Sequence, residues 1–153
     1  MQDTENKEWN YVSVIKTEMV KEKDVLYSGV FTNPKEAAAF AEGFFRKSTR
    51  EMLVVVSLDA QKRPVAAEVV SVGLLSSCMV GIPEVFRHAI LACADALLCF
   101  HNHPSSSLTP STEDIRVTKR LKEAGELLGI RLLDHIIIGG DGSYVSLNEK
   151  GYL

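Results

Sequence analysis

Two histidines one residue apart, His101 and His103, are the residues of this chain whose types and spacing most clearly predict chemistry. The apolar run 96–100 leads directly into them and is typical of a buried strand. Because side chains alternate across a strand, both imidazoles would project from one face where the strand ends, and Asn102 would point to the opposite side. Zinc takes imidazole nitrogens and carboxylate oxygens as ligands. The spacing therefore predicts a zinc site of a hydrolytic kind.

Ser111 and Asp114 continue the pattern at the point where a helix is expected to begin, at Pro110 and Ser111. Serine is a favoured N-cap residue, and an aspartate in the first turn interacts favourably with the helix dipole, so capping alone explains both residue types. Capping does not explain the histidines upstream. Asp114 can also be a third zinc ligand, and Ser111 can hydrogen-bond a substrate oxygen. Three protein ligands leave the fourth position to water, which is the pattern of catalytic zinc.

Hydrolysis at such a site also needs a proton acceptor, and a carboxylate outside the ligand set is suitable. Three glutamates qualify: Glu51, Glu68 and Glu84. Glu51 starts the most apolar strand, Glu68 lies inside the following strand, and Glu84 stands in a first helical turn, where the dipole already explains it. These positions alone leave the choice open.

The composition excludes several classes of protein. With 153 residues, 46% of them apolar and 24% charged, the chain fits one soluble domain. A net charge of −3 gives no positive field that would attract nucleic acid. An apolar run of roughly 18 residues and a hydrophobic signal core are both missing from the sequence, so we expect a cytoplasmic protein with no membrane partner. The odd number of cysteines, in apolar contexts, predicts small core residues in a reduced protein: Cys78, Cys93 and Cys99.

Strands and helices are expected to alternate, which predicts α/β architecture. Residues 1–8 are expected to be a flexible tail, and residues 9–153 a single domain with a mixed sheet flanked by helices. We expect strands over 11–15, 52–58, 65–72, 96–100, 132–138 and 143–146. We expect helices that begin at Pro34 after an Asn33 cap, at Pro83, and at Pro110 and Ser111, the last one ending at Gly129. Helical spacing predicts a buried face on the second helix and another on the third. The residues are Phe86, Ala89, Ile90 and Cys93 on the second helix, and Val117, Leu121, Ala124 and Leu128 on the third.

The ligand pattern resembles the JAMM motif of the JAB1/MPN metalloprotease family: His101-x-His103, seven residues, Ser111, two residues, Asp114. The stretch His-Asn-His-Pro-Ser from residue 101, together with 109–115 and Leu-Asp-His-Ile-Ile-Ile-Gly over 133–139, is similar to the RadC-like branch, over roughly residues 30–153. This resemblance implies a mixed α/β sandwich similar to cytidine deaminases. It also implies that the catalytic acid/base is a glutamate at a strand start ahead of a Leu-Asp pair, which Glu51 matches.

Three departures from the branch have consequences. Ser106 stands where the branch often has glycine, which predicts a stiffer loop, and Pro83 stands where an arginine is common. Full-length RadC proteins usually carry an N-terminal helix-hairpin-helix segment associated with DNA binding, and we expect none in this chain.

The implied function is a zinc-dependent hydrolase of peptide or isopeptide type, with one zinc ion held by His101, His103 and Asp114. Glu51 would move the proton and Ser111 would help to stabilise the oxyanion. The resemblance leaves two alternatives: a nucleic-acid-binding protein associated with DNA repair, which the net charge disfavours, and a non-catalytic interaction module. His135 is expected to support a zinc ligand through a hydrogen bond. An exposed edge strand could pair two copies into a homodimer.

Overall fold

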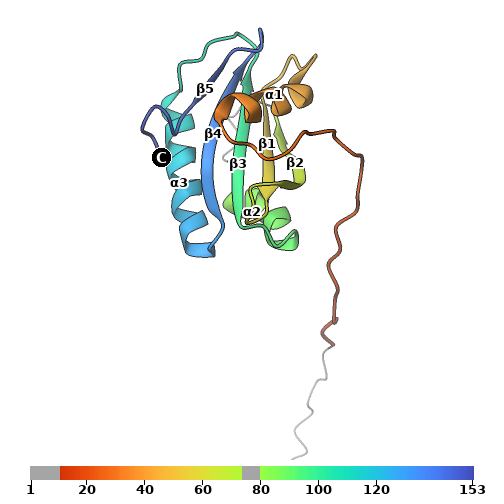
Figure 1. The fold of residues 1–153 in the computed structure, drawn as a ribbon. Coiled ribbons are helices and arrows are strands. Elements are labelled where there is room, and N and C mark those ends of the chain that lie inside the picture. The colour runs from red at the N-terminus through yellow and green to blue at the C-terminus, as the bar shows by residue number, and fades with distance from the viewer. Residues whose placement is uncertain (1–10, 74–79) are drawn as a thin grey trace, which may run out of the picture.

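The computed structural model describes residues 11–73 and 80–153, which form a five-stranded mixed sheet with helices on both faces (Figure 1). The elements are α1 (Pro34–Phe45), β1 (Met52–Leu58), β2 (Pro64–Val72), α2 (Ile82–Leu91), β3 (Ala96–His103), α3 (Thr112–Leu128), β4 (Arg131–Gly139) and β5 (Tyr144–Ser146). The strand order is β2-β1-β3-β4-β5. Only β3 and β4 are parallel, because α3 connects them across the sheet. The predicted fold class is confirmed, whereas the predicted tail lies outside the described residues.

The alternating side chains of β1 and β3 divide the core into two layers. One row, which includes Leu53 and Leu97, packs under α2 and α3. The opposite row, which includes Val54 and Phe100, packs under α1. Figure 1 shows the same arrangement, with α1 in front of the sheet and α2 and α3 behind it. Since His101 has the parity of Leu97, it lies on the side of the sheet that α3 covers.

Local capping signals fix the ends of the helices. Asn33 accepts a hydrogen bond from the Glu36 N–H (3.0 Å) at the start of α1. Ser111 caps α3 in the same way, and Gly129 ends that helix with a φ of 71°, a left-handed conformation that glycine adopts without steric cost. These ends agree with the predicted ones.

Two groups of predictions are wrong, one about a strand and one about buried positions on the helices. Residues 11–15, expected as a strand, have no regular structure and are exposed, because no strand of the described chain lies beside them to pair with. Ile90, Cys93 and Leu128 are also exposed. α2 ends at Leu91, and Cys93 follows in a left-handed turn (φ 51°), so the helical period no longer applies there.

The cysteines should therefore differ in reactivity. Cys78 lies outside the described residues, Cys93 is exposed and Cys99 is buried. Burial raises the pKa of Cys99 to about 12, which leaves roughly 10³-fold less thiolate than in an ordinary thiol. In a Cys78→Ser variant we expect one thiol to react quickly with Ellman's reagent at neutral pH and a second only after unfolding. Two fast thiols would contradict the packing of β3.

Among the described residues, no helix combines the length and the apolarity needed to cross a bilayer.

Candidate metal centre

Three side chains predicted from the sequence converge at the end of β3. His101 and His103 bring their Nε2 atoms to 2.8 Å from one another. Asp114 places Oδ1 3.3 Å from His101 Nε2, and Oδ2 3.7 Å from His103 Nε2. One ligand atom of each residue falls within 4.8 Å of the other two, the spacing of a group that could hold one metal ion. His101 and Asp114 are buried, whereas 12% of the His103 side chain is exposed, so solvent reaches the cluster at His103.

A chain of hydrogen bonds behind the cluster determines which nitrogen of His101 carries a proton. The Thr118 hydroxyl lies 2.6 Å from the Asp114 carbonyl oxygen and 2.6 Å from His135 Nδ1. Because a carbonyl only accepts, the single hydroxyl proton goes to it, and His135 Nδ1 must donate to Thr118. Burial lowers the pKa of His135 to about 3, so its Nε2 is unprotonated and accepts from His101 Nδ1 at 2.8 Å. The lone pair of His101 is therefore on Nε2, inside the cluster.

His103 has the same orientation for a separate reason. Its Nδ1 lies 2.5 Å from the Ser107 carbonyl oxygen, so Nδ1 donates and the lone pair of the neutral ring is on Nε2. Two lone pairs thus face each other beside a carboxylate. A proton between the two nitrogens would give one buried imidazole a positive charge. Burial disfavours this charge and lowers the pKa of His101 to about 3. The donor set fits a divalent cation, and two imidazoles with one carboxylate are ligands that zinc accepts.

Nothing in the sequence indicated Thr118, whose hydroxyl contacts the Asp114 carbonyl oxygen and His135. It is fully buried on α3, one turn after Asp114. A Thr118→Val variant keeps the shape but leaves His135 Nδ1 without its acceptor, so the orientation of His101 is no longer imposed. We expect zinc affinity to fall about 10–100-fold, as for other outer partners of metal ligands. Competition with a chromophoric chelator would measure this.

Thr118→Ser is the matched control for that experiment, because serine retains the hydroxyl. It should bind zinc about as tightly as the parent. Equal affinities for the valine variant and the parent would show that the contact does not orient His101.

Asn102 connects the end of β3 to the start of β1. Its amide nitrogen donates to the Arg50 carbonyl oxygen at 3.0 Å, and its Oδ1 accepts from the Met52 N–H at 2.7 Å. The amide therefore holds the backbone on both sides of Glu51. Strand alternation places Glu51 on the same face as Leu53, which pairs with His101 across β1 and β3. The structure brings Glu51 to the end of the sheet where the cluster lies.

Removing this amide should affect stability as well as position. An Asn102→Ala variant removes the side-chain acceptor of the Met52 N–H, which costs about 1 kcal/mol, whereas the exposed Arg50 carbonyl oxygen keeps the Ser48 hydroxyl as a donor at 2.7 Å. We expect the urea midpoint to fall accordingly while zinc still binds, since Asn102 does not contact the cluster. A variant that unfolds at the parent's midpoint would show that the two hydrogen bonds of the Asn102 side chain do not stabilise the fold.

The other candidate residues have structural partners. Ser111 accepts from the Asp114 N–H at 3.1 Å, and its own N–H donates to Asp114 Oδ2 at 2.7 Å, a reciprocal capping box. Its hydroxyl proton remains available. Glu68 lies 3.2 Å from His88, and Glu84 lies 3.6 Å from Arg87, both on the α2 side of the molecule.

Asp134, whose role the sequence left open, connects two strands through the hydrogen bonds of its carboxylate. Its carboxylate accepts from the backbone N–H groups of His135 (2.7 Å) and Asn148 (3.0 Å) and from the Ser146 hydroxyl (2.5 Å). Burial raises its pKa, and these hydrogen bonds act in the opposite direction. Asp134 joins β4 to the end of β5, and so holds in place the strand that carries His135.

A family profile described as a RadC-like JAB domain matches residues 31–152. The chain belongs to this family. It is 48% identical over 120 residues to a UPF0758 protein of Bacillus licheniformis, covering 78% of this chain and 53% of the relative. It is 46% identical over 123 residues to one of Pelobacter propionicus (80% and 53%), and 43% identical over 121 residues to one of Methanosarcina acetivorans (79% and 52%). The chain spans about half the length of these curated relatives.

The loop after His103 in this RadC-like domain contains the predicted departure at Ser106. Ser106 adopts a left-handed backbone (φ 59°), and its N–H donates to the His103 carbonyl oxygen at 2.9 Å. A non-glycine residue in this region carries steric strain. The left-handed position explains why glycine suits this site, and serine here restricts the loop that contacts His103.

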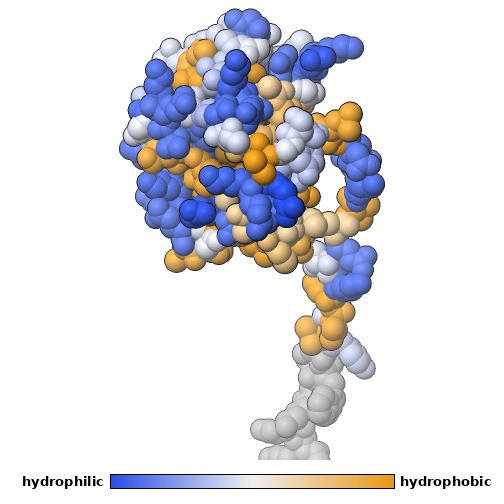
Figure 2. Space-filling view, in the orientation of Figure 1, coloured by the Kyte–Doolittle hydropathy of each residue, from blue (hydrophilic) through white to orange (hydrophobic). Residues whose placement is uncertain are grey.

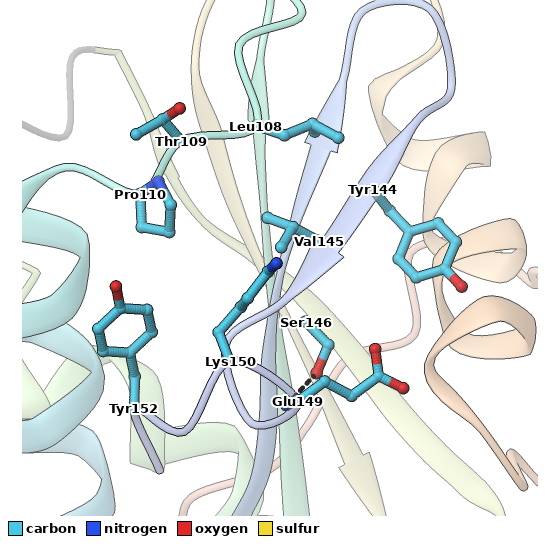
Figure 3. Close-up of a pocket in the computed structure, with 9 residues that line it drawn as sticks. All are labelled: Leu108, Thr109, Pro110, Tyr144, Val145, Ser146, Glu149, Lys150 and Tyr152. Atoms are coloured by element: carbon cyan, nitrogen blue, oxygen red, sulfur yellow. Dashed lines mark hydrogen bonds between the residues drawn. The ribbon is translucent and has the colours of Figure 1, made fainter.

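A hollow of about 640 Å³ adjoins the capping end of α3 (Figure 3). It is lined by Leu108, Thr109, Pro110, Tyr144, Val145, Ser146, Glu149, Lys150 and Tyr152. Pro110, which lines the hollow, directly precedes Ser111, the N-cap of α3. Figure 3 shows the Lys150 ammonium directed toward Val145, whereas the Glu149 carboxylate is directed away from Lys150. The lining is mixed, with apolar side chains and hydroxyl groups beside the one cation, Lys150.

Proposed function

We propose that this RadC-like domain is a zinc-dependent hydrolase that cleaves peptide or isopeptide bonds. The observation that carries the proposal is the convergence of His101 Nε2, His103 Nε2 and the Asp114 carboxylate, with both imidazole lone pairs directed inward. A zinc ion held there would polarise a carbonyl and lower the pKa of water from 15.7 to about 7. Three ligands of this kind match catalytic rather than closed structural sites.

The remaining steps belong to the side chains around the cluster. The Glu51 carboxylate accepts a proton from the attacking water and returns it to the nitrogen that leaves, which balances the reaction without another acid. The backbone clamp of Asn102 holds Glu51 at the end of the sheet. The Ser111 hydroxyl, which already accepts from the Asp114 N–H, donates a hydrogen bond to the carbonyl oxygen as negative charge develops. Such a donor contributes about 2.7–4 kcal/mol in comparable sites.

The hollow beside Ser111 supplies a place for the substrate. Among the described residues Lys150 makes no ion pair, and its ammonium lies beside the apolar side chain of Val145 in a hollow of mixed lining. This combination suits an apolar residue close to a carboxylate. We propose that one side of the cleaved bond binds here, with its carboxylate on Lys150.

Elemental analysis and a cleavage screen test the proposal together. The purified chain should contain about one zinc per molecule and should cleave some members of a library of peptides and lysine-linked isopeptides. Each peptide is presented in two forms, with a free and with an amidated C-terminus, and Lys150 predicts faster cleavage of the free form. A folded chain that binds no zinc, or one that holds zinc and cleaves nothing in the library, would overturn the hydrolase assignment.

A further inference from the structure

The first described residues have side chains typical of a β-strand. No strand of the described chain lies beside them. Residues 11–20, here called the N-terminal segment, alternate apolar and polar side chains in part and have no regular structure. Tyr11 and Val14 are 100% exposed and Val12 is 91% exposed. Figures 1 and 2 show the segment extending away from the domain, with hydrophobic side chains along it. Apolar groups in such numbers are rarely left in water without a partner.

The β2 edge of the sheet could accept a further strand. Within the described part of the chain, β2 is the first strand in the sheet order and pairs with β1 alone, so the backbone groups of its outer edge have no strand partner there. Val65, Val69 and Val72 are 50%, 41% and 55% exposed on this strand. Natural edges are blocked by charges, prolines or coverings. β2 has only Pro64 at its first position and Glu68 in its interior, and α2 packs on one face of β2 without pairing with its edge.

We propose that the N-terminal segment of one copy adds as a sixth strand to the β2 edge of a second copy, and that the exchange is reciprocal. The partner is thus another molecule of this chain. This inference does not depend on the hydrolase function, because neither element contains a residue of the metal cluster.

Geometry favours a second copy over the chain's own edge. Residues 11–20 are exposed throughout and extend beyond the domain, so in the structure the segment does not lie on its own sheet (Figure 1). Reciprocal exchange closes the assembly, since each copy covers one edge and has its own covered.

The surface that such an exchange hides is sufficient for a stable dimer. A ten-residue strand is roughly 33 Å long and a sheet edge about 10 Å thick, so one strand covers on the order of 330 Å² and hides as much of itself. Two strands hide on the order of 1,300 Å², within the roughly 1,200–2,000 Å² of standard interfaces.

The mass of the full chain in solution is the first test. Light scattering on a sizing column should give twice the chain mass of 16.9 kDa, about 34 kDa. Val14→Asp in the segment and Val69→Lys on β2 should each raise the dimer dissociation constant about tenfold or more. Leu26→Asp is the control, because Leu26 is 97% exposed but lies outside the segment. That variant should remain dimeric.

Circular dichroism would show that each variant is folded, which is expected because none of the three residues lies in the core. A 1:1 mixture of the Val14→Asp and Val69→Lys variants should recover association, since one intact segment then meets one intact edge. A monomeric parent would overturn the proposal. So would a Val14→Asp variant that dimerises with the dissociation constant of the parent, which would indicate pairing of β2 with β2. A monomer whose residues 11–20 are protected from hydrogen exchange would show docking on its own edge, and would also overturn it.

Discussion

A Glu51→Gln variant is expected to lose about 10²–10⁴-fold in kcat/KM, the usual contribution of a positioned general acid/base. Glutamine has the same shape but does not accept the proton of the attacking water at neutral pH. Zinc content should remain at about one per chain, because Glu51 is not among the three converging residues. Elemental analysis and steady-state kinetics on the same preparation would separate these two effects.

Glu68→Gln and Glu84→Gln are the matched controls, since each makes the same chemical change at a glutamate that the sequence also offered. Their partners are His88 and Arg87, and neither partner belongs to the metal cluster. Both controls should retain most of the parent's activity. Full activity in the Glu51 variant, or its loss in either control, would mean that the proton acceptor is misassigned.

Replacing Asp114 with Asn is expected to abolish stoichiometric zinc binding. The change removes the negative charge that offsets the cation and leaves two neutral imidazoles to hold it. The loss of affinity should exceed the roughly 10–100-fold expected of an outer partner such as Thr118. At a zinc concentration of 100 times the dissociation constant, binding stabilises the parent by about 2.7 kcal/mol, so its melting temperature should rise with zinc. The variant should show no such rise.

His88→Gln provides the control for zinc binding. His88 is the histidine that lies outside the cluster and its supporting chain, beside Glu68 on the α2 side, so its removal should leave zinc stoichiometry unchanged. An Asp114→Asn variant that binds one zinc as tightly as the parent would place the metal elsewhere, and the hydrolase proposal would lose its basis.

Much of the fold followed from local patterns. The apolar runs that became β1, β3 and β4 were long and continuous, as in strands buried on both faces. Helix starts were readable at Asn33 and Ser111, because a cap and its partner are three residues apart. The predictions failed for Cys93, beyond the end of a helix, and for residues 11–15, which have strand-like side chains but no neighbouring strand.

The sequence by itself determined that His101 and His103 share one face and that Asp114 begins a helix, because the strand period and the capping pattern act over a few residues. Only the tertiary structure decided which groups support them. Thr118 contacts His135 across 17 positions, and His135 contacts His101 across 34. Asn102 reaches Arg50 across 52. These contacts depend on strand order and on the parallel pairing of β3 with β4, which short-range patterns do not contain.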